Sequence, residues 1–164
     1  MTPLGDPEGP YSHEYPYDAH GNMVEMPHLS AMIWDHDDQL QEVSAGSETV
    51  YFQYGGGNRS RKYTEKSGTT TEERIYLGNF EIYRKRVSGD IDVERESLHV
   101  SDGSGRILLI ETKTIDEGDA VTTPVGIWRY QISNHIGSAA TEITQDGGII
   151  SYEEYHPYGT TAYR

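Results

Sequence analysis

The stretch of residues 35–38, Asp-His-Asp-Asp, gathers three carboxylates and an imidazole, which are groups that bind metal ions. A calcium-binding EF-hand loop starting at Asp35 would need Gly at its sixth position and Glu at its twelfth. Those two positions are occupied by Leu40 and Gly46. The spacing therefore argues against a calcium loop, and we expect no metal ion at this stretch.

The histidines do not supply a zinc motif either. His13 and His20, or His28 and His36, are too far apart to share one turn of a helix, and they lie in Pro-rich or loop-like sequence. The chain has no Cys, which excludes a disulfide, a thiolate nucleophile and a Cys-ligated zinc. The sequence predicts no metal and no cofactor.

Catalytic chemistry finds equally little support. His135 and Ser138 are close enough in sequence to suggest a base and a nucleophile, but no catalytic motif surrounds them. With 27 acidic residues a carboxylate pair can always be found, so such a pair carries no information. No G-x-S-x-G elbow or phosphate-binding loop is present. We expect no enzyme activity and no catalytic residues.

The charge of the chain excludes one class of partner. Thirteen basic residues against 27 acidic ones give a formal net charge of -14, which repels a phosphate backbone, so nucleic-acid binding is not expected. The N-terminus lacks the basic and apolar regions of a signal peptide, and no stretch of the sequence approaches a membrane span.

Short runs of β-branched and aromatic residues alternate with turn signals along most of the chain. No window keeps a helical period for more than two turns, and Gly78-Asn79 is a two-residue hairpin signal. We therefore expect an all-β fold. The predicted strands are Leu29 to Trp34, Thr49 to Tyr54, Arg59 to Glu65, Glu73 to Leu77, Phe80 to Arg86, Val93 to Val100, Arg106 to Thr114, Gly126 to Ser133, Ala139 to Thr144 and Gly148 to Tyr155.

One turn motif has a physical rationale of its own. In the segment of residues 17–23, YDAHGNM, the Asp18 side chain can accept hydrogen bonds from backbone amides within the turn. Gly21 can supply the positive φ that a tight hairpin needs. The residues on either side, Tyr17 and Met23, would then lie on opposing strands, so the segment predicts a hairpin.

Related segments follow along the chain, and intervals of roughly 17 to 20 residues separate the first three, which is typical of a repeat architecture. They are Trp34, Asp35 and Leu40; then Tyr54, Gly57, Asn58 and Arg59; and a degenerate copy at Asp102, Gly105, Arg106 and Ile107. Near the C-terminus come Asn134 to Ser138, then Gln145 and Gly148, and finally Tyr155, His156, Pro157, Tyr158 and Gly159.

This ordered series resembles the YD-repeat proteins of bacteria, and residues 129–164 resemble the start of their RHS repeat-associated core. The match runs from about Tyr15 to the end of the chain, and it departs from the family pattern at Ile136 for Leu and at Gln145 for Asp. The resemblance implies antiparallel YD-repeat hairpins that form a curved sheet, a fragment of a hollow β-shell. It divides the chain into a Pro/Gly-rich N-terminus (1–14), a YD-repeat sheet (15–128) and the start of the core (129–164).

The resemblance also implies which residues matter, and it gives them structural roles in turns and in stacking between strands. These residues are Tyr17, Asp18, Gly21, Asn22, Trp34, Tyr54, Asn58, Gly137, Tyr155, Pro157, Tyr158 and Gly159. Proteins of this family continue past the last motif into a self-cleaving segment and a variable effector. Because this sequence does not contain those segments, the resemblance assigns no catalytic role here.

The function implied by the resemblance is that of a non-catalytic shell fragment of an RHS-type polymorphic toxin, which encloses or presents a C-terminal effector. Its partners would be neighbouring YD-repeat segments and an encapsulated toxin domain, self-association is expected, and its location would be secreted or cell-surface. The alternative is a small extracellular adhesion or glycan-binding β module, in which some of the 13 Tyr and two Trp residues would be stacking platforms.

Overall fold

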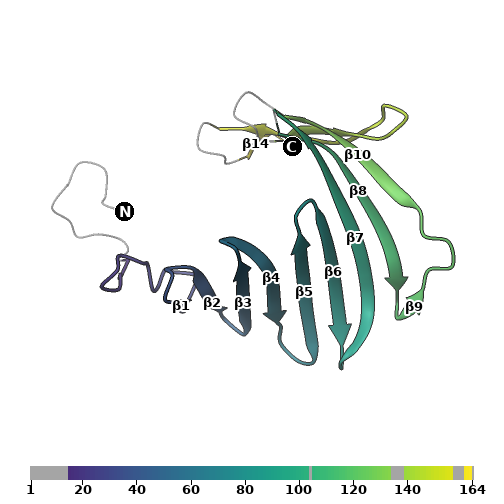
Figure 1. The fold of residues 1–164 in the computed structure, drawn as a ribbon. Helices are drawn as coiled ribbons and strands as arrows, with labels where there is room; N and C mark the ends of the chain where they lie inside the picture. Colours follow the sequence, from purple (N-terminus) through teal and green to yellow (C-terminus); the bar gives the residue numbers. More distant parts are fainter. Residues whose placement is uncertain (1–14, 104, 134–138, 157–160, 164) are drawn as a thin grey trace. The chain divides into compact units, whose positions relative to one another are not determined.

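The computed structural model describes residues 15–103, 105–133, 139–156 and 161–163. Every regular element in these ranges is a β-strand, and the paired strands are antiparallel, as Figure 1 shows. The prediction of an all-β, antiparallel fold is confirmed. No helix in the described ranges has the length and apolar character needed to cross a membrane.

The chain divides into two compact units, and each is described here by itself. The first contains residues 1–74 and 86–89, and the second contains residues 75–85 and 90–164. The expected boundary between the YD-repeat sheet and the core, at residues 128 and 129, lies within a strand of the second unit.

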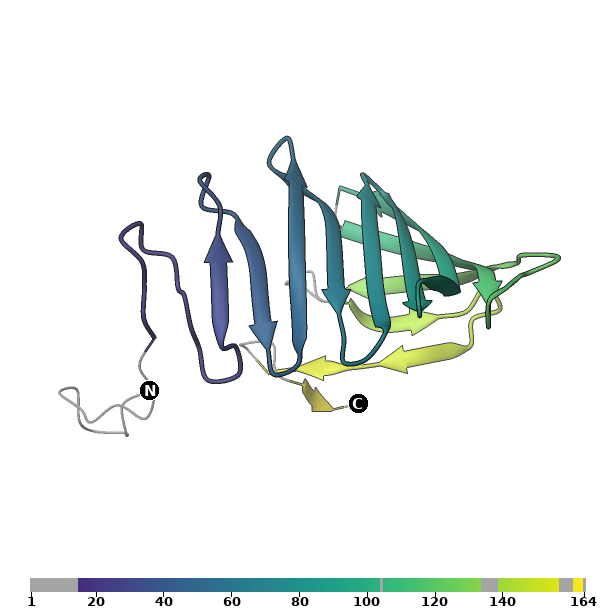
Figure 2. The same cartoon turned by 90° about the horizontal axis from the view of Figure 1, so that it is seen from below.

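The first unit is a meander in which each strand pairs with the next one in sequence. Its strands are β1 (Ala31–Trp34), β2 (Leu40–Ala45), β3 (Glu48–Gly55), β4 (Asn58–Glu65) and the first part of β5 (Thr70–Leu77). Figure 2 shows successive strands of this unit running in opposite directions. Val43, Val50 and Thr64 are register partners across β2, β3 and β4, and Val43 and Thr64 are buried.

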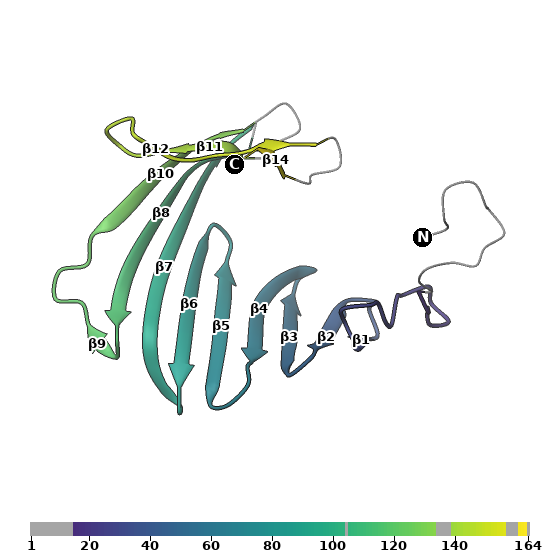
Figure 3. The ribbon, with the colours of Figure 1, turned by 180° about the vertical axis from the view of Figure 1, so that it is seen from behind.

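The second unit begins with the end of β5, continues in the order β6-β7-β8-β10-β11-β12, and has β9 paired with β8 and β13 paired with β14. Figure 3 shows β10, β11 and β12 succeeding β8. The strands are β6 (Phe80–Val87), whose last two residues belong to the first unit, β7 (Asp90–Asp102), β8 (Gly105–Asp116), β9 (Asp119–Ala120), β10 (Gly126–Ser133), β11 (Ala139–Ile143), β12 (Ile149–Tyr152), β13 (Glu154–Tyr155) and β14 (Thr161–Tyr163).

The sheet of the second unit has one apolar face and one polar face. Opposite residues in a strand pair share a face, and side chains alternate between faces along each strand. The apolar face carries the register partners Leu98, Ile110 and Trp128, and a second row of Val100, Leu108, Tyr130 and Ile143. The polar face carries His99, Leu109 and Arg129, with Gln131 and Glu142 in the next row.

Little of this apolar face is covered. Among the described residues, the only hydrophobic residues that are buried are Val43 and Leu108, and each keeps some exposure, while Trp128 is 40% exposed and Ile132 55%. A sheet with so small a core depends on contacts between neighbouring strands.

Cross-strand ion pairs supply many of those contacts. Within the first unit Arg61 Nε lies 2.5 Å from Glu73 Oε1, and within the second Arg84 Nε lies 2.6 Å from Glu94 Oε2. Each of these pairs is only partly shielded from water, so each contributes modestly to stability, in the range of about 0.2 to 1 kcal/mol.

Some strands were not expected from the sequence. β2 was not predicted, because its only β-branched residue is Val43 and its other residues favour no particular element. β9 and β14 are too short to leave a periodic pattern. The hairpin signal at Gly78-Asn79 does separate two strands, since β5 ends at Leu77 and β6 begins at Phe80.

Candidate functional site: a repeated aspartate turn

The first YD segment forms a five-residue turn organised by Asp18. Its backbone N–H donates to Asn22 O at 2.9 Å, and Gly21 N donates to Asp18 O at 3.1 Å. The carboxylate oxygen Oδ1 accepts from the backbone N–H groups of His20 and Asn22, both at 2.9 Å. Gly21 has a φ of 90°, a backbone angle that residues other than Gly rarely adopt. The flanking residues Tyr17 and Met23 form an antiparallel bridge.

The segment after Trp34 folds into the same turn. Asp35 N donates to Gln39 O at 2.9 Å, and Asp35 Oδ1 accepts from the backbone N–H groups of Asp37 and Gln39, both at 2.9 Å. Asp38 occupies the place of Gly21 and has a φ of 57°. Asp is one of the few side chains that tolerate this left-handed region.

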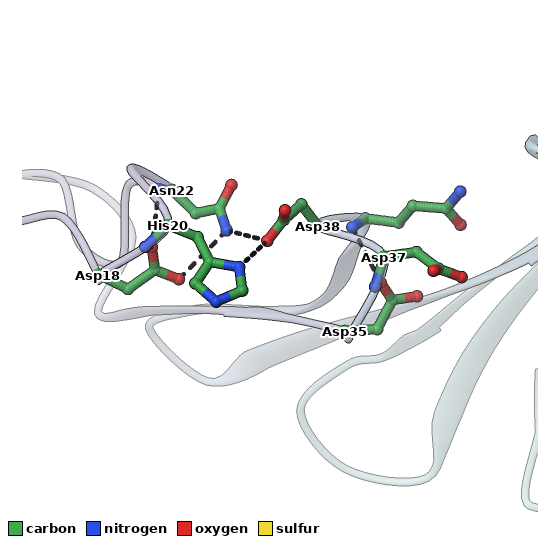
Figure 4. Close-up of polar contacts among 7 residues, drawn as sticks. Asp18, His20, Asn22, Asp35, Asp37 and Asp38 are labelled. Atoms are coloured by element: carbon green, nitrogen blue, oxygen red, sulfur yellow. Dashed lines mark hydrogen bonds and ion pairs between the residues drawn. The ribbon is translucent and has the colours of Figure 1, made fainter.

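These two turns are joined by side chains, as Figure 4 shows. Asp38 Oδ1 accepts a hydrogen bond from Asn22 Nδ2 at 2.8 Å and lies 2.9 Å from His20 Nδ1. Asn22 Nδ2 also donates to Asp18 Oδ2 at 3.2 Å. The stretch that looked like a metal loop is therefore a turn whose carboxylates are engaged by protein donors.

A third turn has the same backbone pattern with a different organising side chain. Thr144 N donates to Gly148 O at 2.7 Å, and Gly148 N donates to Thr144 Oγ1 at 2.9 Å. Gly147, with a φ of 83°, is the residue in the left-handed region, one position before the Gly148 singled out in the sequence. A hydroxyl thus takes the place of the Asp carboxylate.

Two of the aromatic residues singled out in the sequence, Trp34 and Tyr54, hold neighbouring segments together, and Tyr155 makes a local contact. Trp34 Nε1 donates to Met23 O at 2.7 Å, which ties β1 to the first turn. Tyr54 Oη donates to Leu40 O at 2.9 Å, from β3 to β2. Tyr155 Oη donates to Glu153 Oε2 at 2.8 Å, and this bond raises the pKa of Tyr155.

Asn58 lies in a turn of another kind. It pairs with Gly55 across a two-residue hairpin loop in which Gly56 and Gly57 both have positive φ, 58° and 81°. A loop with positive φ at both central residues matches the right-handed twist of the strands that it joins. The turn at Tyr54 to Asn58 is therefore tighter than the aspartate turn.

Four of the residues predicted to be structural, Gly137, Pro157, Tyr158 and Gly159, lie outside the described residues. The structural roles proposed for all twelve residues stay predictions. The sequence analysis did not include Asp38 and Thr144 among them, although both could have been found by aligning residues 34–40 and 143–149 on residues 17–23. In the described residues no group of three or more His, Asp or Glu side chains could hold a metal ion.

The aspartate turn predicts a pH dependence of stability. The backbone N–H of Asn22 holds the pKa of the Asp18 carboxyl below its ordinary value, and the Asn22 side chain, followed by His20, does the same for Asp38. Each carboxylate therefore stabilises the fold above the pKa that it has in the unfolded chain. This contribution begins to decrease as the pH falls below about 3.8, the ordinary pKa of Asp. It is lost once the pH has fallen through the lower pKa that each carboxyl has in the folded protein.

We expect urea unfolding to show that Asp38→Asn is less stable than the unchanged protein at pH 7, and that the difference shrinks as the pH approaches 2.5. Asn also tolerates positive φ, so the substitution adds little backbone strain. Asp146→Asn is the control for the loss of one exposed carboxylate. A difference between Asp38→Asn and the unchanged protein that stays constant with pH would contradict the assignment.

No family model matches the chain. Its sequence is 25% identical over 156 residues to the toxin subunit YenC1 of Yersinia entomophaga. Its fold matches the crystal structure of TcdB2-TccC3 with a TM-score of 0.72 and 26% sequence identity. This chain is related to a bacterial toxin subunit. The similarity covers 89% of the chain in both comparisons, but only 16% of YenC1 and 7% of the matched TcdB2-TccC3 chain.

The fold match to TcdB2-TccC3 and the repeated turn both support a relationship to these toxin proteins. The similarity extends along most of the described sheet, so it is carried by the series of strands and turns and not by one motif. Because the chain spans a small part of each of these proteins, what they do as wholes enters only as a proposal.

Proposed function

We propose that this chain is a segment of the β-sheet wall of an RHS-type polymorphic toxin. Its role is structural and non-catalytic, and the wall encloses or presents a C-terminal effector that lies outside these residues. The observation that carries the proposal is the combination of a repeated aspartate turn with a TM-score of 0.72 against TcdB2-TccC3.

The way the turns are linked supports a role as wall material. Asp38 binds the side chains of the preceding turn, and Trp34 donates to the backbone just after that turn. Each such contact is made between one hairpin and the next, which is the mode of stabilisation in repeat proteins. A sheet built in this way can be extended without a central core.

The partners that fit this role are neighbouring YD-repeat segments and an enclosed effector domain. The uncovered apolar face, with Leu98 and Trp128 among its exposed residues, is a surface that such neighbours could cover. Export to the cell surface or the medium follows from the same proposal, because a toxin acts outside the cell that makes it.

The alternative, a glycan-binding module, is favoured by one observation. Trp34 is held by its hydrogen bond to Met23, but Trp128 is 40% exposed and has Tyr130 beside it, with ring centroids 6.3 Å apart. Adjacent exposed aromatic rings can stack on sugars. The alternative therefore rests on Trp128 and not on Trp34.

The coding region around these 164 residues provides the test. We expect an upstream array of further YD repeats and a downstream effector followed by an immunity gene. Electron microscopy of the whole product should then show a hollow particle. A glycan-array signal from this chain that Trp128→Ala abolishes, together with a coding region free of YD repeats, would support the binding module instead.

A further inference from the structure

A continuous series of polar side-chain contacts crosses the sheet of the second unit on its polar face. It begins with His99 on β7, which contacts Arg106 on β8. Arg106 Nε donates to Gln131 on β10, and Gln131 Nε2 donates to Glu142 on β11 at 2.5 Å. Glu142 also accepts from Ser151 on β12 at 3.2 Å. We call these five residues the polar network, and it joins five successive strands of the sheet.

His99 is the residue of the polar network that belongs to a type that changes its charge between about pH 5 and pH 8. Its Nδ1 atom lies 2.8 Å from Arg106 Nη1. Because a guanidinium can only donate, Nδ1 must accept this hydrogen bond, and the uncharged ring carries its proton on Nε2. A second proton, on Nδ1, would remove the acceptor and place two cations side by side. The contact with Arg106 therefore requires a neutral imidazole.

A carboxylate lies on the other side of the ring. Glu81 Oε1, on β6, is 3.3 Å from His99 Nε2. Nε2 is buried and has no hydrogen-bond partner among the described residues, so the ring is aligned for Arg106 and not for Glu81. Only 20% of the His99 side chain and 15% of the Glu81 side chain are exposed. A charged imidazolium in this place would be held by the Glu81 carboxylate, since partial burial strengthens such a pair.

Glu81 and Arg106 are the charged groups in contact with the ring. Alternation along β6 and β8 places four other ionisable side chains on this face, and each has another partner. Lys85 pairs with Asp92, Glu111 with Arg95 and Lys113 with Asp116, and the Tyr83 ring lies beneath Arg95. Leu109 is the register partner of His99 and lies between it and Arg129 on β10. The ring therefore faces one carboxylate and one guanidinium.

The contact between His99 and Arg106 crosses an irregular part of the sheet. The register of β7 with β8 shifts between Val100 and Ser101. Two register pairs lie beyond the shift, Ser101 with Arg106 and Asp102 with Gly105. We call these two pairs the outer end of the β7–β8 hairpin. A bulge disrupts the backbone ladder locally, so a side-chain contact that spans it contributes to holding the outer end closed.

We propose that His99 is an acid-sensitive switch that controls the outer end of the β7–β8 hairpin. At neutral pH the uncharged ring accepts from Arg106 and ties β8 to β7 across the bulge. At lower pH the ring takes a proton from solvent on Nδ1, Glu81 holds the charged ring, and Arg106 leaves it. The outer end then opens. This inference concerns the second unit alone and holds whether or not the chain is a segment of a toxin wall.

The test measures amide hydrogen exchange of the whole chain by NMR at about pH 7.5 and about pH 5.5, corrected for the intrinsic pH dependence of exchange. We expect the protected amides of the outer end to lose at least about fivefold in protection at the lower pH. Amides of Leu98 and Ile110, on the other side of the bulge, should stay within about twofold. This pH range lies above the one in which the Asp18 and Asp38 carboxylates take up protons.

Three variants separate His99 from other ionisable groups. His99→Gln keeps an acceptor for Arg106 and a donor for Glu81 but cannot titrate, so it should abolish the pH dependence. Glu81→Gln removes the carboxylate that holds the charged ring, so the opening should move to lower pH by at least about 0.5 unit. His36→Gln is the matched control, because the His36 side chain is 88% exposed and lies in the first unit, and it should change nothing.

Several results would overturn the proposal. One is protection at the outer end that is the same at both pH values, and another is a pH dependence that persists in His99→Gln. Loss of the dependence in His36→Gln would assign it to a different histidine. The ring ¹⁵N shifts of the unchanged protein provide a measurement that needs no variant. A proton on His99 Nδ1 at about pH 7.5 would contradict the hydrogen bond on which the switch depends.

Discussion

Replacing Leu108 by alanine is expected to lower the free energy of unfolding by about 2 to 4 kcal/mol. Leu108 is only 8% exposed, and its register partners on the apolar face are Val100 on β7 and Tyr130 on β10. The substitution removes buried methyl groups and leaves a gap in a sheet that has little other buried apolar surface. Urea denaturation measures the loss.

Ile149→Ala is the matched control, because Ile149 is also an aliphatic strand residue but is 72% exposed. Its removal should cost less than about 1 kcal/mol. If the two substitutions destabilised the protein equally, Leu108 would not be part of a core, and the stability of the second unit would have to come from its hydrogen bonds and ion pairs.

The sequence predicted the strands that carry β-branched and aromatic residues and the turns that carry glycine. Gly78-Asn79 and the Asp18 turn are local features, since every donor and acceptor in them lies within a few residues. Local features of this kind can be derived from spacing alone. Strand β2, which begins at Leu40, could not be derived in this way, because only its pairing with β1 and β3 makes it extended.

The contacts between turns also escaped the sequence analysis. Asp38 was considered as a metal ligand, but its carboxylate accepts from Asn22, which is 16 residues earlier. Nothing in the local sequence specifies that contact. Similarly, Arg106 and Gln131 meet although 25 residues separate them, because β8 and β10 are neighbours in the sheet. Contacts of this kind can be predicted only when the order of the strands in the sheet is known.

Self-association of the isolated chain is expected to strengthen as salt is raised. The apolar face is largely uncovered, and β12 ends the strand order of the second unit, so apolar surface and unpaired backbone groups are both available to another chain. The net charge of -14 opposes close approach. That repulsion is screened beyond about 8 Å at physiological ionic strength and beyond about 3 Å at about 1 M.

Light scattering across a salt series, at two protein concentrations, measures this association. Ile149→Lys should reduce association at every salt concentration, because it places a charge on the exposed apolar surface next to the sheet edge. Asp146→Lys, in the adjoining turn, makes the net charge less negative than Ile149→Lys does. It is therefore the control for the effect of net charge on association. A compact monomer with a sharp, concentration-independent melt at high salt would show that the sheet is self-sufficient. The chain would then need no neighbouring repeats, and the proposal that it is a segment of a larger wall would lose its physical basis.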